Sequence, residues 1–247
     1  MKLASFRFFF RILTVMAVLI VPLAGLAQDL KPIVLPKPKT TGGMPLMDAL
    51  SARKTTREFS ADKLPLQTLS NLLWAAFGVN RAEMAGRTPK PGRTAPSAMN
   101  LQEIDLYVAF SEGVYLYEAV PHRLVTVVAK DVRALTNRNA AAGTAALCFI
   151  FVEDQDKRPA PPAKTPPAGA PPAGAPPAGS PQAAPPRSTS GEVDAGFIGQ
   201  NIYLFCASEG LNAWFYGTDR AGLANALNLR PGQRVLYGQA VGYPKKK

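Results

Sequence analysis

The chain is 247 residues long, enough for one domain with a sizeable core, and its formal net charge is +11. A basic balance suits anionic partners, but no nucleic-acid-binding module and no interleaving of aromatic and basic residues accompanies it, so we expect no nucleic-acid partner. One histidine and two cysteines, without Cys-x-x-Cys or His-x-x-x-His spacing, argue against a zinc site, and we expect no metal.

Residues 1–27 have the pattern of a cleaved export signal. A basic start precedes an apolar core over residues 12–20, and Gly25 and Ala27 place small residues at the cleavage positions. The apolar core is shorter than the ~20 residues that a bilayer span needs. We therefore expect cleavage after Ala27 and a periplasmic or secreted protein with no stable membrane span.

The folded part is predicted to begin after an arm. Residues 28–43 are rich in Pro, Lys and Thr, which predicts a flexible N-terminal arm. Residues 44–247 are then predicted to form one domain. It opens with a short amphipathic helix that ends at Ala52 and has three apolar side chains on one face: Leu46, Met47 and Leu50.

A second helix and four strands are predicted next. Proline is well tolerated where a helix opens and glycine where it closes, so the helix should run from Pro65 to Gly78. Its apolar residues recur at helical spacing: Leu66, Leu69, Leu73 and Phe77. Alternating apolar residues predict a hairpin of two strands at 104–110 and 114–117, and residues 124–128 are a further strand or an extended segment. A continuous apolar run predicts a strand buried on both faces at 145–152.

Residues 158–190 differ from the rest of the chain. Pro-Pro-Ala-Gly-Ala recurs there with a five-residue period, and such a sequence buries too little surface to offset its ordering entropy. We interpret it as a disordered insertion looped out of the domain. The alternative, a linker between two domains, leaves only residues 191–247 beyond it, a poor size for a separate core.

A long helix is predicted over residues 194–210, with Asp194 near its start and Gly210 just past its end. Its apolar residues lie on more than one face, which predicts burial nearly all round. An extended segment over 211–216, a short helix over 219–228 and a last strand over 235–241 complete the chain.

The most polar short segment is Arg53-Lys54-Thr55-Thr56-Arg57. Arg53 and Arg57 stand two positions either side of Thr55, so two planar guanidiniums and a hydroxyl group can converge on a small dianion such as a phosphate monoester. The alternative interpretation is a solvated basic helix end that offsets the helix dipole.

Together these segments resemble the nitroreductase family of flavoproteins, in particular its branch similar to the SagB-type dehydrogenases. The resemblance runs from about Met44 to Pro244, broken only by the proline-rich insertion. It is carried by five motifs: Arg53 to Phe59, with Thr55 where serine is usual; Arg93 to Ala98 with Asn100; Asp194 to Leu211; Trp214 to Gly217; and Gly242 to Pro244.

The resemblance implies an α+β fold with a mixed or antiparallel central sheet flanked by helices, and a long buried central helix that forms much of a homodimer interface. It also implies FMN as the cofactor. The residues that it assigns to FMN binding are Arg53, Lys54, Thr55, Arg57, Pro96, Ser97, Ala98, Asn100, Tyr216, Gly217 and Lys245.

Within that set, the basic segment would grip the phosphate, and Lys54 or Arg57 would stabilise the negative charge of reduced flavin. The turn at Pro96 would lie along the ring, and main-chain N–H groups near Tyr216 would face the flavin N5 edge. Lys245 would replace a basic residue that family members usually carry further on. No side chain is implied as an indispensable acid or base, because the flavin does the redox chemistry.

Two functions are consistent with these residues. The first is an FMN-dependent oxidoreductase that transfers a hydride or electron pair to a small organic substrate by a ping-pong mechanism. The second is a non-catalytic envelope scaffold on the same fold that binds a partner through its proline-rich segment. Cys148 and Cys206 are either a disulfide or buried free thiols, and His122 is expected to be an ordinary surface residue.

Overall fold

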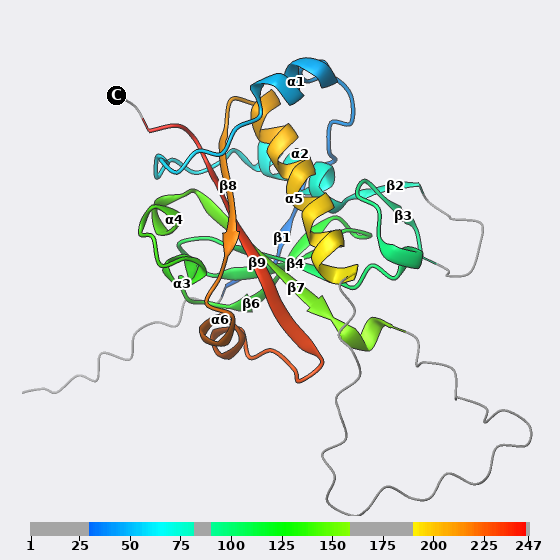
Figure 1. Cartoon of the computed structure of the whole chain (residues 1–247), viewed down its shortest axis with the longest axis vertical. Coiled ribbons are helices and arrows are strands. Elements are labelled where there is room, and N and C mark those ends of the chain that lie inside the picture. The colour runs from blue at the N-terminus through cyan, green and yellow to red at the C-terminus, as the bar shows by residue number, and fades with distance from the viewer. Residues whose placement is uncertain (1–29, 82–89, 159–189, 246–247) are drawn as a thin grey trace, which may run out of the picture.

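The computed structural model describes residues 30–81, 90–158 and 190–245 (Figure 1). The predicted export signal lies outside the described residues. So does the predicted insertion, apart from its flanking residues Arg158 and Ser190. Among the described helices, none is both long enough and apolar enough to cross a membrane.

A seven-stranded sheet forms the centre of the molecule, and every pairing between its neighbouring strands is antiparallel. The strands lie in the order β1-β6-β5-β4-β7-β9-β8, so β8 and β1 are the two edges. Their bounds are β1 Ile33–Val34, β4 Ile104–Ala109, β5 Val114–Glu118, β6 Arg123–Val128, β7 Leu147–Asp154, β8 Asn212–Gly217 and β9 Gln233–Gly242; β2 Val79–Arg81 and β3 Gly92–Arg93 pair separately. The predicted α+β class and antiparallel sheet are confirmed.

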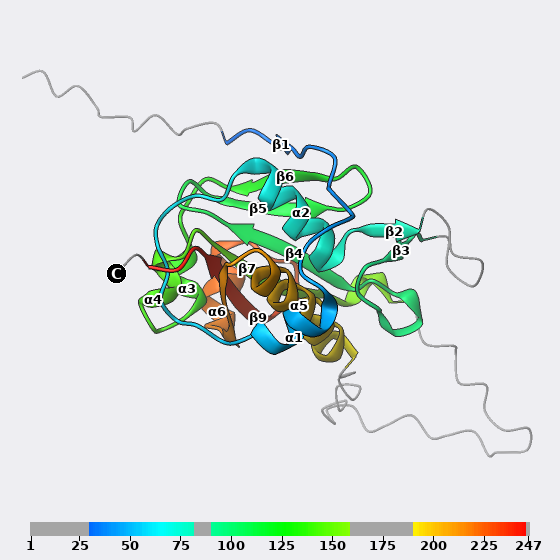
Figure 2. The ribbon, with the colours of Figure 1, turned by 90° about the horizontal axis from the view of Figure 1, so that it is seen from above.

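Helices cover both faces of this sheet (Figure 2). On one face lie α2 (Leu66–Phe77) and α5 (Ser190–Ser208), with α1 (Leu46–Ala52) against α5. On the other face lie α3 (Arg133–Thr136), α4 (Ala141–Thr144) and α6 (Arg220–Ala226). The remaining elements are two short 3-10 helices, η1 (Ala98–Asn100) and η2 (Gln155–Lys157).

Strand β7 divides the hydrophobic core in two. Its side chains alternate between the faces of the sheet, because successive residues of a strand point in opposite directions. Leu147, Phe149 and Phe151 join the cluster under α2 and α5, whereas Ile150 and Val152 join the cluster under α6. All eight residues of β7 are buried, which confirms the predicted strand with two covered faces.

Helix α2 also follows its prediction, with Pro65 before it and Gly78 after it. Helix α5 differs in two respects. It begins at Ser190, four residues before Asp194, so Asp194 lies inside the helix and is not near its first residue. The predicted burial nearly all round fails at Phe197, which is 44% exposed. The predicted C′ glycine is confirmed by the left-handed φ of +67° at Gly210.

The segment predicted as a flexible arm is docked on the domain over residues 30–39, so that prediction is wrong there. Residues of β1 pair with β6, and Leu35 is buried beside α2. Three main-chain groups also bind α2: the Pro36 carbonyl accepts from Ser70, the Lys37 carbonyl accepts from Gln67, and the Lys39 amide donates to Asn71. Strand pairing and the burial of Leu35 outweigh the conformational entropy that is lost when the arm is ordered, although its composition predicted flexibility.

His122 is not an ordinary surface residue. Its Nε2 lies 2.7 Å from Oγ of Ser70, and its Nδ1 lies 2.9 Å from the hydroxyl of Tyr117. Ser70 donates its own proton to the Pro36 carbonyl, so Nε2 donates to Ser70 and Nδ1 accepts from Tyr117. Burial lowers the pKa of His122 below its ordinary value. The imidazole thus links the arm, α2 and β5 in its neutral form.

Cys148 and Cys206 are buried free thiols, which decides between the two alternatives. They pack in the two different halves of the core, on opposite faces of the sheet.

Candidate functional site

The basic segment lies along the open edge of β8. The chain leaves the helical conformation at Arg53, whose ψ is 123°, and continues in an extended form. The Thr56 amide donates to the Ala213 carbonyl at 3.0 Å, and Asn212 Nδ2 donates to the Glu58 carbonyl at 2.6 Å. Phe59 then anchors the segment in the core. This packing brings the first predicted motif beside the strand that carries the fourth.

Tyr203 of α5 joins these two motifs. Its hydroxyl accepts from the Phe215 amide at 2.8 Å and lies 3.0 Å from Oγ1 of Thr55. The guanidinium of Arg53 lies over the same ring, 5.4 Å from its centroid. Tyr203 was not among the predicted site residues, because an aromatic residue inside an apolar helix gives no sequence signal that separates it from the core.

Arg57 lies over the other aromatic ring of the site, with its Cζ 5.2 Å from the centroid of Trp214. Lys54, Thr55 and Arg57 are exposed. In the part of the chain that the structure describes, no carboxylate forms an ion pair with Arg53, Lys54 or Arg57. The basic segment is therefore an uncompensated cationic edge, which favours an anionic ligand.

A cavity of about 270 Å³ opens beside this edge. Its walls include Lys54, Thr56, Asn212 and Pro244. Oγ1 of Thr56 is buried and has no hydrogen-bond partner among the described residues. Lys245 directly follows Pro244, so the closing motif and the predicted Lys245 lie near the basic segment. A buried hydroxyl group without a partner favours a ligand that can hydrogen-bond there.

The strand edge also determines which predicted main-chain groups are open. In an antiparallel strand the N–H and C=O of one residue point to the same side, and sides alternate along the chain. The Ala213 carbonyl and the Phe215 amide point to the open edge, since they bind Thr56 and Tyr203. By this alternation the Gly217 amide points there too, whereas the amide of Tyr216 faces β9.

Tyr216 therefore has neither its amide nor its side chain at the open edge, and its predicted contact with a cofactor stays a prediction. Its side chain is 7% exposed and its hydroxyl lies 2.8 Å from Oγ1 of Thr136 and 3.5 Å from Sγ of Cys148. Burial raises the pKa of Tyr216 above its ordinary value, which keeps the phenol neutral. Trp214 and Tyr216 point into one half of the core, and Ala213 and Phe215 point into the other.

A second cavity, of about 470 Å³, lies at the Gly217 end of β8. Its lining includes Asn137, Arg138 and Arg220 in addition to Gly217. It lies on the same face of the sheet as Arg57, because the Trp214 ring under Arg57 packs against Tyr216, which binds Thr136. Sequence reasoning missed Asn137 and Arg138, which lie far from the motifs in the chain and have no spacing that marks them.

The turn at Pro96, Ser97 and Ala98 is not part of this edge. The amide of Ala98 donates to the carboxylate of Asp194, in the first half of α5. Tyr203 lies nine residues further along the helix, a distance of about 14 Å at 1.5 Å per residue. One chain thus brings the basic segment, the edge of β8 and Pro244 together, and holds the predicted ring-binding turn, with Asn100, apart from them.

That turn has an unusual backbone. Met99, Asn100 and Gln102 have left-handed φ values of 49°, 54° and 52°. This conformation costs about 1–2 kcal/mol at Met99 and at Gln102, and less at Asn100 because asparagine tolerates it. Ser97 Oγ accepts from the Gln102 amide at 2.7 Å. Gln102 in turn accepts from Arg93 Nε at 2.8 Å. Met99, at the tip, is 76% exposed.

The model of the nitroreductase family matches residues 50–243, which contain the basic segment, the Ser97 turn, α5 and the edge of β8. The chain belongs to the nitroreductase family. Among curated proteins, a nitroreductase homologue from Methanocaldococcus jannaschii is 33% identical over 87 residues, which are 35% of this chain and 43% of that protein, so the match spans less than half of this relative.

One solved structure supports the family assignment, and two others share the fold. A nitroreductase homologue from Ralstonia eutropha JMP134 is 36% identical, with a TM-score of 0.72, and the match covers 90% of this chain and 93% of that one. A family structure from Desulfovibrio desulfuricans in complex with FMN shares the fold at 16% identity and a TM-score of 0.52, over 83% of this chain and 89% of that one. NADPH:FMN oxidoreductase from Vibrio harveyi, complexed with NAD+, shares it at 18% identity and a TM-score of 0.51, over 81% and 69%.

Proposed function

We propose that this nitroreductase-family protein is an FMN-dependent oxidoreductase that transfers a hydride or electron pair to a small organic substrate by a ping-pong mechanism. The observation that carries the proposal is the uncompensated cationic edge at Arg53, Lys54 and Arg57, next to the buried, unpartnered hydroxyl group of Thr56. Two solved relatives of the same fold are named for FMN, one as an FMN complex and one as an FMN oxidoreductase.

The residues present fit this cofactor. Arg53, Thr55 and Arg57 would hold the phosphate, because guanidinium groups and a hydroxyl group suit a phosphate dianion. Lys54 lines the adjoining cavity, and Lys245 lies close by. At the other end of β8, the open Gly217 amide and the cavity at Asn137 and Arg138 would receive the ring, where cationic and N–H groups favour the anionic reduced form.

When bound, FMN would supply the redox chemistry itself. The chain supplies orientation and charge. Arg57 stacks on Trp214 and Arg53 on Tyr203, so each guanidinium is held by an aromatic face and keeps N–H groups free for an anion. Tyr203 fixes Thr55 relative to β8, because one hydroxyl group contacts both.

We propose further that a second copy of the chain completes the site. The Ser97 turn lies about 14 Å along α5 from Tyr203, which holds the phosphate end, and it presents Met99 to the outside. Large apolar side chains are also exposed on α1 and α5, namely Leu46, Met47, Leu50, Val193 and Phe197. Such exposed apolar side chains are typical of an interface between protein chains. A homodimer would place the turn of one chain over the edge of its partner.

Purification of the protein and titration with FMN test the function. A yellow protein whose flavin absorbance bleaches under a chemical reductant is expected, and Arg53→Ala should weaken FMN binding at least tenfold. Arg123→Ala is the matched control, because Arg123 is an exposed cation on β6, remote from β8. A colourless protein that gains no flavin absorbance on titration would contradict the proposal and favour a non-catalytic scaffold.

A further inference from the structure

The turn from Ser97 to Gln102 needs support from outside itself. Three of its residues have left-handed φ values, and none of the three is a glycine. Backbone of this kind persists only when surrounding contacts determine it. Ser97 Oγ accepts from the Gln102 amide within the turn, and other hydrogen bonds join the turn to Lys90, Pro91, Arg93 and Lys157. None of these hydrogen bonds joins the turn to α5, the helix that also carries Tyr203.

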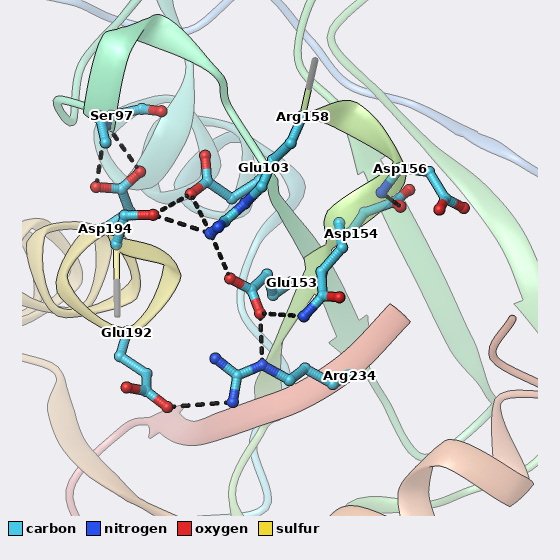
Figure 3. A network of polar contacts seen from close by, with 12 residues as sticks. Ser97, Glu103, Glu153, Asp154, Asp156, Arg158, Glu192, Asp194 and Arg234 are labelled. Atoms are coloured by element: carbon cyan, nitrogen blue, oxygen red, sulfur yellow. Dashed lines mark hydrogen bonds and ion pairs between the residues drawn. The ribbon is translucent and has the colours of Figure 1, made fainter. Parts of the chain in front are cut away.

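Asp194 supplies that connection (Figure 3). The amide of Ala98 lies 3.1 Å from one of its carboxylate oxygens and 3.3 Å from the other. Asp194 is 2% exposed and sits on the buried side of α5, directly beneath the turn. A hydrogen bond from an amide to an ionised carboxylate is stronger than one between neutral groups. This contact fixes the position of the turn relative to α5.

The helix is itself fixed at this end by a buried polar network. Ser190, the first residue of α5, donates to Glu103 Oε1 at 3.0 Å and accepts from Arg158 at 2.9 Å. Arg158 also forms an ion pair with Glu153 of β7 at 2.7 Å. Glu103 and Glu153 are both fully buried. Because these charges are paired inside the protein, the start of α5 is held against the sheet, and Asp194 with it.

We propose that Asp194 is a positioning residue that fixes the Ser97–Gln102 turn for contact with the flavin ring, an inference that rests on the proposed function. It is not proposed as a proton donor, since its carboxylate is buried and occupied by the Ala98 amide. Its role concerns the ring end of the site only. The phosphate end, at Arg53 and Thr55, is held by Tyr203 and is independent of it.

Three substitutions separate position from charge. Asp194→Ala removes the acceptor and leaves the Ala98 amide without one. Asp194→Asn keeps an acceptor of the same size and should largely rescue the wild-type behaviour. Asp194→Glu keeps the charge but moves the carboxylate by one methylene, and it serves in place of the alanine variant if that variant fails to fold. Glu192→Gln is the matched control, because Glu192 lies on the same helix turn and contacts Arg234, not the Ser97 turn.

The first measurement is hydrogen exchange of the full chain without added flavin. Amides of residues 98–102 should exchange at least tenfold faster in Asp194→Ala or Asp194→Glu than in the wild-type protein. Asp194→Asn and Glu192→Gln should leave their exchange close to the wild-type rate. Unchanged exchange in both the alanine and the glutamate variants would overturn the positioning role directly, whatever the protein does with flavins.

The second measurement compares dissociation constants for FMN and for riboflavin, which lacks the phosphate. Displacing or removing the Asp194 carboxylate should weaken both about tenfold and leave their ratio unchanged, whereas Arg53→Ala should weaken FMN alone. If the wild-type protein binds FMN and the alanine or glutamate variant binds both flavins with the same affinities as the wild type, the role of Asp194 is overturned and the proposed function stands. A wild-type protein that binds neither flavin overturns the proposed function and with it the role of Asp194 toward the ring.

Discussion

The hydroxyl of Tyr203 lies 3.0 Å from Oγ1 of Thr55 and accepts a hydrogen bond from the Phe215 amide at 2.8 Å. One phenol group thus connects the central helix, the basic segment and the open edge of β8. Together with the hydrogen bonds of Thr56 and Glu58 to β8, this contact holds a segment without regular secondary structure in a defined position beside the strand. The position of the basic segment therefore depends on Tyr203, a residue that carries no charge.

Tyr203→Phe should therefore weaken the site without removing any of its cations. The substitution leaves the Phe215 amide without its acceptor and frees Thr55, at a cost of about 1–2 kcal/mol in the free energy of unfolding. We expect FMN affinity to fall about fivefold, as measured by quenching of flavin fluorescence. Tyr237→Phe is the control, because Tyr237 contacts Phe215 through its ring alone, at 5.0 Å between centroids. Equal effects of the two substitutions would contradict the role of the Tyr203 hydroxyl.

Local sequence signals predicted the elements of this fold that depend on near neighbours. Helix α2 follows from the helical spacing of its leucines between Pro65 and Gly78, and β7 follows from a continuous apolar run of strand length. The basic segment was identified from its composition, because few short segments hold so many cations and hydroxyl groups. In each of these cases the residues that determine the structure lie within about a dozen positions of one another.

The errors concern long-range pairing. Leu35 becomes buried only because β1 pairs with β6, about ninety residues away, and no local pattern marks that pairing. Tyr216 and Gly217 were both predicted, but the side to which β8 presents each amide depends on its register with β9, which no local pattern determines. Asn137 and Arg138 line the cavity at Gly217 only through tertiary packing. Sequence reasoning therefore found the cationic part of the site and missed most of its walls.

Docking of the arm can be tested at Leu35. This side chain is 6% exposed and packs with α2 and β6, so Leu35→Ala should lower the free energy of unfolding by about 2–4 kcal/mol. The neighbouring Val34 is 78% exposed, and Val34→Ala should change the free energy of unfolding by less than about 0.5 kcal/mol. Urea denaturation of both variants measures the difference. A flexible arm would make the two substitutions equally mild.

The neutral His122 predicts a pH dependence of stability. Burial lowers its pKa in the folded state below the ordinary value of about 6.5, so the unfolded chain binds more protons just below that pH. The contribution of the neutral imidazole should therefore be complete above about pH 7 and should be lost progressively as the pH falls below about 6.5. His122→Asn is a suitable reference, because asparagine tolerates the left-handed φ of 49° at this position and does not titrate.

The measurement is the difference in unfolding free energy between wild type and His122→Asn, determined from urea denaturation between about pH 5 and 8. Because His122 is the single histidine of the chain, its ring resonances in proton NMR report its pKa directly. A difference that does not vary with pH would show that the imidazole has the same proton affinity in both states. A difference that grows in favour of the wild type at low pH would reverse the assigned sign.

The exposed apolar side chains of α5 provide the test of the two-chain site. Phe197 is 44% exposed on the helix that also carries Asp194 and Tyr203, so a second copy packed there would bury it together with Val193. Phe197→Glu should place a charge in that interface, shift the protein to monomer in analytical ultracentrifugation, and lower FMN affinity at least tenfold because the partner's turn is lost. Val120→Glu, at a 68% exposed position in the β5–β6 turn, should change neither property. A Phe197→Glu variant that stays dimeric, or a monomer that binds FMN as tightly as the wild type, would show that the Ser97 turn of a second chain is not needed at the cationic edge.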